Sequence, residues 1–133
     1  MLAWSTVKYG ANAPKSWADF FDTVKFPGRR SLPARPSGSL EVALLADGVS
    51  FDKLYPLDVE RAFKKLETLG KDLTALWRLG GHSVQLMKDG EVDMIAMFNG
   101  RADGAIKDGV KLAYTFNQGI MTFSCWGVPK GSK

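Results

Sequence analysis

The segment from Val92 to Phe98 places the strongest constraint on the fold, because it is almost entirely apolar and contains the β-branched residues Val92 and Ile95. A strand with one wet face alternates polar and apolar residues, whereas a strand covered on both faces reads as a continuous apolar run. Helices packed on the two faces of a sheet provide such cover. The segment therefore predicts a layered α/β domain with this strand in its central sheet.

Strands and helices alternate along the rest of the chain. Short apolar runs bounded by turn residues predict strands at 1–4, 31–34 and 73–77, and two more between 110 and 128 that Asn117-Gln118-Gly119 separates. Polar or glycine-containing starts followed by helical periodicity predict helices at 16–22, 40–47, 58–69 and 80–90, and a short one after 99. Because no Pro/Ser/Gly-rich linker divides the chain, residues 1–133 are expected to form a single domain.

Local signals refine several of these elements. Ser16 and Asp19 have the spacing of a capping box, and Gly70 is expected to follow the last turn of the helix at 58–69. Pro33, within the strand expected at 31–34, suits an edge strand or a strand end. One face of the 58–69 helix is apolar and is expected to be buried against the sheet; its residues are Val59, Ala62, Phe63, Leu66 and Leu69.

Composition and charge exclude some classes of function but do not indicate one. The chain has 45% hydrophobic residues and a net charge of +4, which suits many kinds of partner. The basic segment Lys25–Arg30 is short and is expected to be a solvated loop, so nucleic-acid binding is not predicted. Cys125 is the only cysteine and is expected to be a buried, inert thiol. No apolar run reaches the ~18 residues of a membrane span, and the amino terminus lacks the pattern of a signal peptide.

The sequence offers little for catalysis. A single His82 and a single Cys125 cannot supply a metal site, and no nucleophile or phosphate-loop motif occurs. Glu91 and Asp93 are expected to be solvated at the entry of a strand. No cofactor and no enzymatic activity are therefore predicted. The junctions at 36–39 and 80–83 lead from loops into helices, and each either caps its helix or binds a small anion.

Several ordered motifs resemble one family. Residues 14–22 (PKSWADFFD) and 25–30 (KFPGRR) resemble the P-x-S-W-x-D-x-x-D…F-x-G-x-R segment of spermidine/putrescine-type periplasmic solute-binding proteins of ABC transporters. Further blocks keep the order of that family, at 54–58, 90–94, 98–101 and 126–131. The resemblance covers the chain from about Trp4 to Lys130.

The resemblance implies a fold, a function and a location. The fold would be a three-layer αβα lobe of the type II periplasmic-binding-protein class, with a central mixed sheet, and the chain resembles the second lobe alone. The complete protein would be a periplasmic component that captures a small solute between two lobes and delivers it to an ABC permease in the inner membrane. Its partners would be the solute, the permease and the missing first lobe. A ligand-sensing regulatory or interaction domain built on the same lobe is the alternative.

The resemblance also suggests binding residues. Phe98 corresponds to an aromatic that packs on the ligand, while the positions of family carboxylates fall at Gly38, Arg101 and Ser124. A second stacking aromatic of the family falls at Thr122. Together with a nearby arginine and helix-start serines, the expected ligand-binding residues are Arg35, Ser37, Gly38, Ser39, Phe98, Arg101, Thr122 and Ser124.

Two expectations for the solute follow from this set. The family implies a polyamine, whereas arginine forks and free helix amides favour an anionic or zwitterionic solute. In the polyamine case, Arg101 would pair with a surface acid such as Asp103 or Asp108, and carboxylates of the first lobe would bind the ligand.

Overall fold

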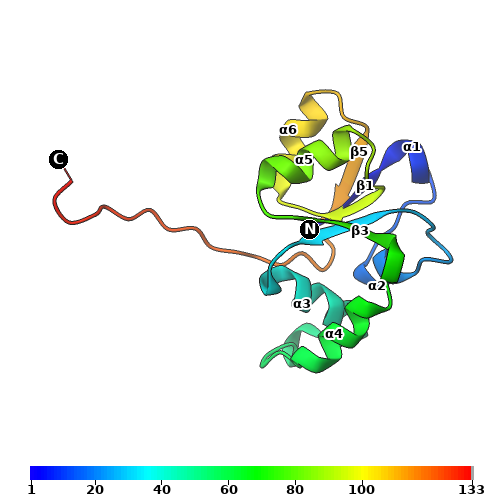
Figure 1. The fold of residues 1–133 in the computed structure, drawn as a ribbon, viewed down its shortest axis with the longest axis horizontal. Coiled ribbons are helices and arrows are strands. Elements are labelled where there is room, and N and C mark those ends of the chain that lie inside the picture. The colour runs from blue at the N-terminus through cyan, green and yellow to red at the C-terminus, as the bar shows by residue number, and fades with distance from the viewer. Residues whose placement is uncertain (133) are drawn as a thin grey trace.

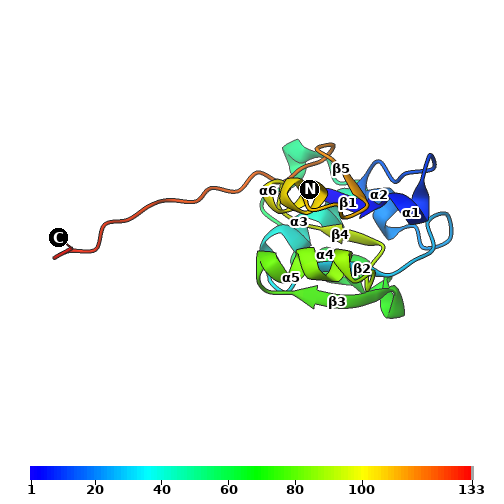
Figure 2. The ribbon, with the colours of Figure 1, turned by 90° about the horizontal axis from the view of Figure 1, so that it is seen from above.

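The computed structural model describes residues 1–132 and is built around a five-stranded mixed sheet (Figure 1). The strands follow the order β3-β2-β4-β1-β5, which is also the order in which Figure 2 shows them from one edge of the sheet to the other. Strand β2 is parallel to β3 and β4, whereas β1 is antiparallel to β4 and β5. The strands are β1 (Leu2–Ser5), β2 (Arg30–Pro33), β3 (Leu73–Trp77), β4 (Met94–Ala96) and β5 (Leu112–Thr115).

Helices cover both faces of this sheet, which confirms the three-layer α/β prediction (Figure 1). Helices α2, α3 and α4 pack on one face, and α5 and α6 pack on the other. Short turns of 3₁₀ helix span Phe51–Lys53 and Gly70–Asp72. The α-helices are α1 (Thr6–Tyr9), α2 (Trp17–Phe21), α3 (Pro36–Ala46), α4 (Val59–Glu67), α5 (Gly80–Lys88) and α6 (Asn99–Lys107).

The central strands send side chains alternately into two hydrophobic cores. Met94 lies in the core beneath α2, α3 and α4, whereas its neighbour Ile95 lies in the core beneath α5 and α6. Leu2 and Ala3 of β1 divide between the two cores in the same way. This alternation places apolar residues on both faces of a strand, which is the reason for the continuous apolar run in the sequence.

The capping box predicted at the start of α2 is confirmed in part. Ser16 is the N-cap of α2, and its Oγ accepts a hydrogen bond from the Asp19 N–H at 3.2 Å. The Asp19 carboxylate reaches one residue further back than expected and accepts from the Lys15 N–H at 2.8 Å. Asp58 caps α4 by accepting from the Arg61 N–H at 3.0 Å. Strand β3 has the predicted bounds.

Two strand predictions need correction. β4 covers only Met94–Ala96, because the N–H groups of Asp93 and Met94 both donate to the Arg29 carbonyl and set the entry to the strand. β2 is an interior strand and not an edge, so of the two places expected for the proline the strand end is confirmed, with Pro33 in the last position of β2. Asp93 is buried and accepts from the Arg29 N–H at 2.8 Å, so it is not the solvated residue that the sequence predicted.

The apolar face of α4 is only partly buried. Ala62 and Leu69 are buried and Leu66 is half-buried, whereas Val59 is 47% exposed and Phe63 is 51% exposed. The prediction that Phe63 is buried against the sheet was therefore wrong. Helix α4 packs against α3, so only the strip that faces α3 is covered. Gly70, with φ of +46°, begins a 3₁₀ turn two residues after the Thr68 C-cap.

Two further segments differ from the prediction. Phe26 and Arg30 are buried, so residues 25–30 are not simply a solvated loop. The carboxyl end contains β5 alone; within residues 1–132, the segment after Thr115 adds no strand, first packs against α2 through Gln118, and then extends away from the body (Figure 1). Cys125 and Trp126 are therefore exposed, because their apolar neighbours pack against nothing in the described residues.

Candidate functional site

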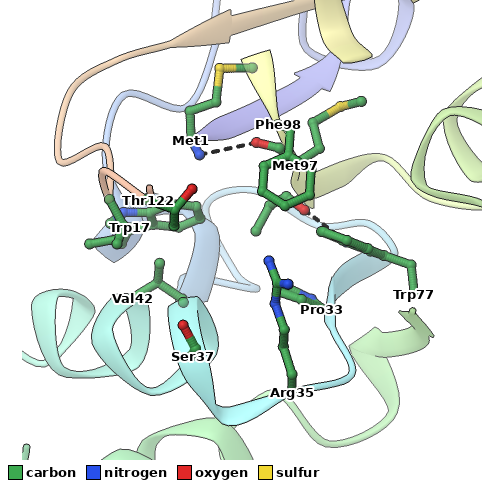
Figure 3. Close-up of a pocket in the computed structure, with 13 residues that line it drawn as sticks. Met1, Trp17, Pro33, Arg35, Ser37, Val42, Trp77, Met97, Phe98 and Thr122 are labelled. Carbon is green, nitrogen blue, oxygen red and sulfur yellow. Dashed lines mark hydrogen bonds between the residues drawn. The ribbon is translucent and has the colours of Figure 1, made fainter. Parts of the chain in front are cut away.

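A pocket opens where the carboxyl ends of β2 and β4 meet the amino end of α3 (Figure 3). It contains about 440 Å³ of space, part of which is open to solvent. Clefts at the carboxyl ends of parallel strands are the usual ligand sites of open α/β sheets. The pocket is lined by Met1, Trp17, Pro33, Arg35, Ser37, Gly38, Val42, Trp77, Ala96, Met97, Phe98, Ile120 and Thr122.

Arg35 is the charged side chain of this pocket, and two aromatic rings hold it. Its guanidinium carbon lies 5.8 Å from the centroid of the Trp77 ring and 5.3 Å from that of Phe98. These two rings meet edge to face at 5.5 Å, and the Trp77 Nε1–H donates to the Ala96 carbonyl at 2.8 Å. A guanidinium over aromatic faces is stabilised without neutralising its charge. Among the described residues, no carboxylate forms an ion pair with Arg35.

The amino end of α3 forms the opposite wall. Ser37 and Gly38 have non-helical backbone angles, and the continuous helix begins at Ser39. Gly38 has φ of +87°, a conformation that favours glycine, and this kink brings Ser37 and Gly38 to the pocket surface. The Gly38 N–H donates to the Glu41 carboxylate at 2.7 Å, so this amide is already occupied.

The structure brings five of the eight predicted binding residues together. Arg35, Ser37, Gly38, Phe98 and Thr122 all line the pocket. Their convergence places segments from β2–α3, β4–α6 and the chain after β5 around one space.

The other three predicted residues lie outside the pocket. Ser39 is buried, and its hydroxyl donates to the Pro33 carbonyl at 2.9 Å. Arg101 lies on α6 beside Gly80, and Ser124 lies in the exposed carboxyl segment. Among the described residues, Arg101 forms an ion pair with neither Asp103 nor Asp108, and Asp103 accepts from the Tyr114 hydroxyl at 2.7 Å.

Sequence reasoning did not assign Trp17 and Trp77 to the site. The Trp17 Nε1–H donates to the Gln118 carbonyl at 2.8 Å, and its backbone N–H donates to the Gln118 side chain at 2.9 Å. These bonds tie α2 to the segment after β5 and bring Ile120 and Thr122 to the pocket. The contact spans 101 residues of sequence, so no local pattern could have indicated it.

The chemistry of the pocket is aromatic, apolar and cationic. None of its lining residues is acidic, and Arg35 is the one arginine or lysine among them. The described residues contain no group of side chains that could hold a metal ion. No helix within them has the length and apolar character to cross a membrane. The arrangement suits a small molecule that presents a carboxylate to Arg35 and an apolar chain to the rings.

Comparisons with known proteins identify the family of the chain. The family model described as "Bacterial extracellular solute-binding protein" matches residues 1–133. The chain is 41% identical to the γ-aminobutyric acid-binding protein of Pseudomonas aeruginosa over 99% of its length. It is 52% identical to an ABC transporter substrate-binding protein from Bradyrhizobium japonicum, whose crystal structure matches 86% of the chain with a TM-score of 0.84. These relatives are solute-binding proteins, in agreement with the prediction that the chain is not an enzyme.

The same comparisons limit what can be transferred. The chain spans 38% of the γ-aminobutyric acid-binding protein and 36% of the Bradyrhizobium protein. The spermidine/putrescine-binding protein PotD of Streptococcus pneumoniae matches 85% of the chain and 34% of its own length, with a TM-score of 0.69 but only 19% identity. That likeness shows the shared fold alone.

Proposed function

Because the chain belongs to the bacterial extracellular solute-binding proteins, we propose that it forms one lobe of the substrate-binding component of an ABC importer. The single mixed sheet and the short span relative to the named relatives support this assignment. In this proposal a second lobe closes over the pocket, and closure traps the solute between two walls. The membrane permease is the further partner, and the protein acts in the periplasm.

The proposed solute is a small zwitterionic amino acid such as γ-aminobutyrate. The observation that carries this choice is the guanidinium of Arg35, which lies over Trp77 and Phe98 and has no carboxylate partner within residues 1–132. A solute carboxylate could accept two parallel hydrogen bonds from this fork. The binding specificity of the Pseudomonas relative supports the same solute class.

A polyamine has less support as the solute. Its ammonium groups would meet the charge of Arg35, and no lining residue of this lobe offers a carboxylate to offset their desolvation. The likeness to the polyamine-binding protein PotD does not support a polyamine, because at 19% identity it extends to the fold alone. The regulatory alternative finds no support among the relatives named above.

Calorimetry on the complete protein tests the proposal with two solutes of similar length. γ-Aminobutyrate and putrescine share one ammonium group and differ at the other end, where a carboxylate replaces an aminomethyl group. We expect γ-aminobutyrate to bind and putrescine to bind at least about 100-fold more weakly, which corresponds to the two charge-assisted hydrogen bonds of the fork. 4-Aminobutanamide keeps the ammonium group and replaces the carboxylate by an uncharged amide, so its affinity should fall between those of the other two solutes.

Variants of two arginines provide the matched comparison. Arg35→Met should lower the affinity for γ-aminobutyrate about 100-fold, and Arg35→Lys should lower it less, because lysine keeps the charge but loses the fork. Arg78→Met is the control, since Arg78 is exposed and does not line the pocket. Tighter binding of putrescine than of γ-aminobutyrate, or an unchanged affinity in Arg35→Met, would contradict the proposed solute class.

A further inference from the structure

Glu41 is a buried carboxylate that is hydrogen-bonded to the pocket wall. It is 5% exposed, lies in α3 three residues after Gly38, and does not line the pocket itself. Its Oε2 accepts from the Gly38 N–H at 2.7 Å, and its Oε1 accepts from the Tyr55 hydroxyl at 3.0 Å. A buried carboxylate needs such partners, since an unpaired one costs several kcal/mol. The two oxygens therefore join two separate segments of the chain.

The first of these segments is the wall of the pocket. Ser37 and Gly38 interrupt the helical angles of α3, so ordinary helix hydrogen bonds do not fix their position. Two hydrogen bonds hold the wall in place instead. The Gly38 N–H donates to Glu41, and the Ser39 hydroxyl donates to the Pro33 carbonyl. Arg35 lies in the loop that the hydrogen bond between Ser39 and Pro33 closes.

The second segment reaches the surface. Tyr55 is 63% exposed, and its ring belongs to the loop between α3 and α4. Burial of its hydroxyl, followed by the hydrogen bond to Glu41, raises the pKa of Tyr55, so the group stays a protonated donor at neutral pH. The Glu41 carboxylate thus accepts one hydrogen bond from the partly exposed Tyr55 and one from Gly38 in the pocket wall.

We propose that Glu41, supported by Tyr55, is a positioning residue that fixes the Ser37–Gly38 wall and thereby sets the affinity for the solute. The proposal rests on the function proposed above. Glu41 does not line the pocket, so it acts through the Gly38 amide alone. Fixing a wall before binding reduces the ordering that the solute must otherwise cause, which favours tight binding.

The experiment compares variants at both ends of this connection in the complete protein. Glu41→Gln keeps an oxygen that can accept from Gly38, whereas Glu41→Met keeps the length of the side chain and removes the acceptor. Tyr55→Phe removes only the second bond. Glu60→Met is the control, because Glu60 is exposed on α4 and has no part in the pocket.

Two readouts are measured for each variant. Calorimetry gives the affinity for γ-aminobutyrate, and hydrogen exchange with mass spectrometry follows the peptide that contains Gly38. We expect Glu41→Met to lower the affinity roughly 5- to 10-fold and to speed exchange at Gly38, with Tyr55→Phe changing both in the same direction by less. Glu41→Gln and Glu60→Met should stay within about twofold of the wild-type affinity.

The outcomes separate the two proposals. If wild type binds γ-aminobutyrate and Arg35→Met does not, but Glu41→Met binds normally with protected Gly38, the positioning role is overturned and the proposed function stands. If wild type fails to bind, the proposed function is overturned, and exchange at Gly38 alone decides whether Glu41 holds the wall. If Glu41→Met does not fold, an unchanged affinity and unchanged exchange in Tyr55→Phe would overturn the role of the connection.

Discussion

Replacing Arg30 by methionine should lower the free energy of unfolding by about 4 kcal/mol. The Arg30 side chain is fully buried, and it has no carboxylate within ion-pair distance in the described residues. Its guanidinium instead donates to main-chain carbonyls at the end of α2 and in the segment that joins α2 to β2; the acceptors belong to Phe20, Asp22, Phe26 and Gly28. Arg30 therefore provides the hydrogen bonds that regular secondary structure would otherwise provide to these carbonyls.

The magnitude follows from these four hydrogen bonds. Hydrogen bonds to a charged group contribute about 1.5 kcal/mol each at the lower end of their range, so their joint loss would cost about 6 kcal/mol. Roughly 2 kcal/mol is recovered, because methionine removes a charge whose burial is unfavourable. That desolvation is also the reason why the pKa of the Arg30 guanidinium is lowered.

Urea denaturation followed by circular dichroism measures this difference. Arg29→Met is the control, because the Arg29 side chain is 51% exposed and pairs with Asp93 at 3.5 Å. A pair of this kind contributes at most about 1 kcal/mol. A loss below about 1 kcal/mol in Arg30→Met, or a loss no larger than in Arg29→Met, would refute the view that Arg30 organises the segment.

Two further predictions concern the same region. Burial raises the pKa of Tyr9 to about 12, so the folded state holds the phenol proton more tightly than the unfolded state does. The resulting contribution to the free energy of unfolding is present below pH ~10 and is lost between about pH 10 and 12. Urea titrations across that range should show a steeper decline for wild type than for Tyr9→Phe, and parallel declines would contradict the assignment. Gly28→Ala should cost about 2–4 kcal/mol, because a Cβ would lie 2.5 Å from the Tyr9 hydroxyl and 2.9 Å from Asp93 Oδ2. Gly81→Ala, where a Cβ meets nothing within 4 Å, should not destabilise the protein, and equal melting temperatures for the two variants would argue against the clash.

These residues also explain one of the sequence motifs. In the F-x-G-x-R pattern, Phe26 enters the core, Gly28 leaves room for Tyr9 and Asp93, and Arg30 closes the segment. The motif is thus a structural element of the fold and does not line the pocket. The motif therefore indicates the family but gives no information on which solute is bound.

Local chemistry was sufficient for the layered fold and for much of the site. The apolar run around Met94 and Ile95, the cap at Ser16 and the bounds of β3 depend on near neighbours, so the sequence alone predicted them. The loop-to-helix pattern at residues 36–39 and the family resemblance together indicated Arg35, Ser37 and Gly38, and such a loop keeps its place at the carboxyl end of the preceding strand.

Only the tertiary structure decided what depends on distant partners. Apolar character alone suggested burial for Phe63 and Cys125, yet burial requires a covering surface, and α3 covers only one strip of α4 while nothing in the described residues covers Cys125. The aromatic support of Arg35 joins β3 to the end of β4, and Gln118 joins the last segment to α2. Such contacts form when the sheet brings strand ends together, so the sequence determined which elements exist and the packing determined which side chains share the pocket.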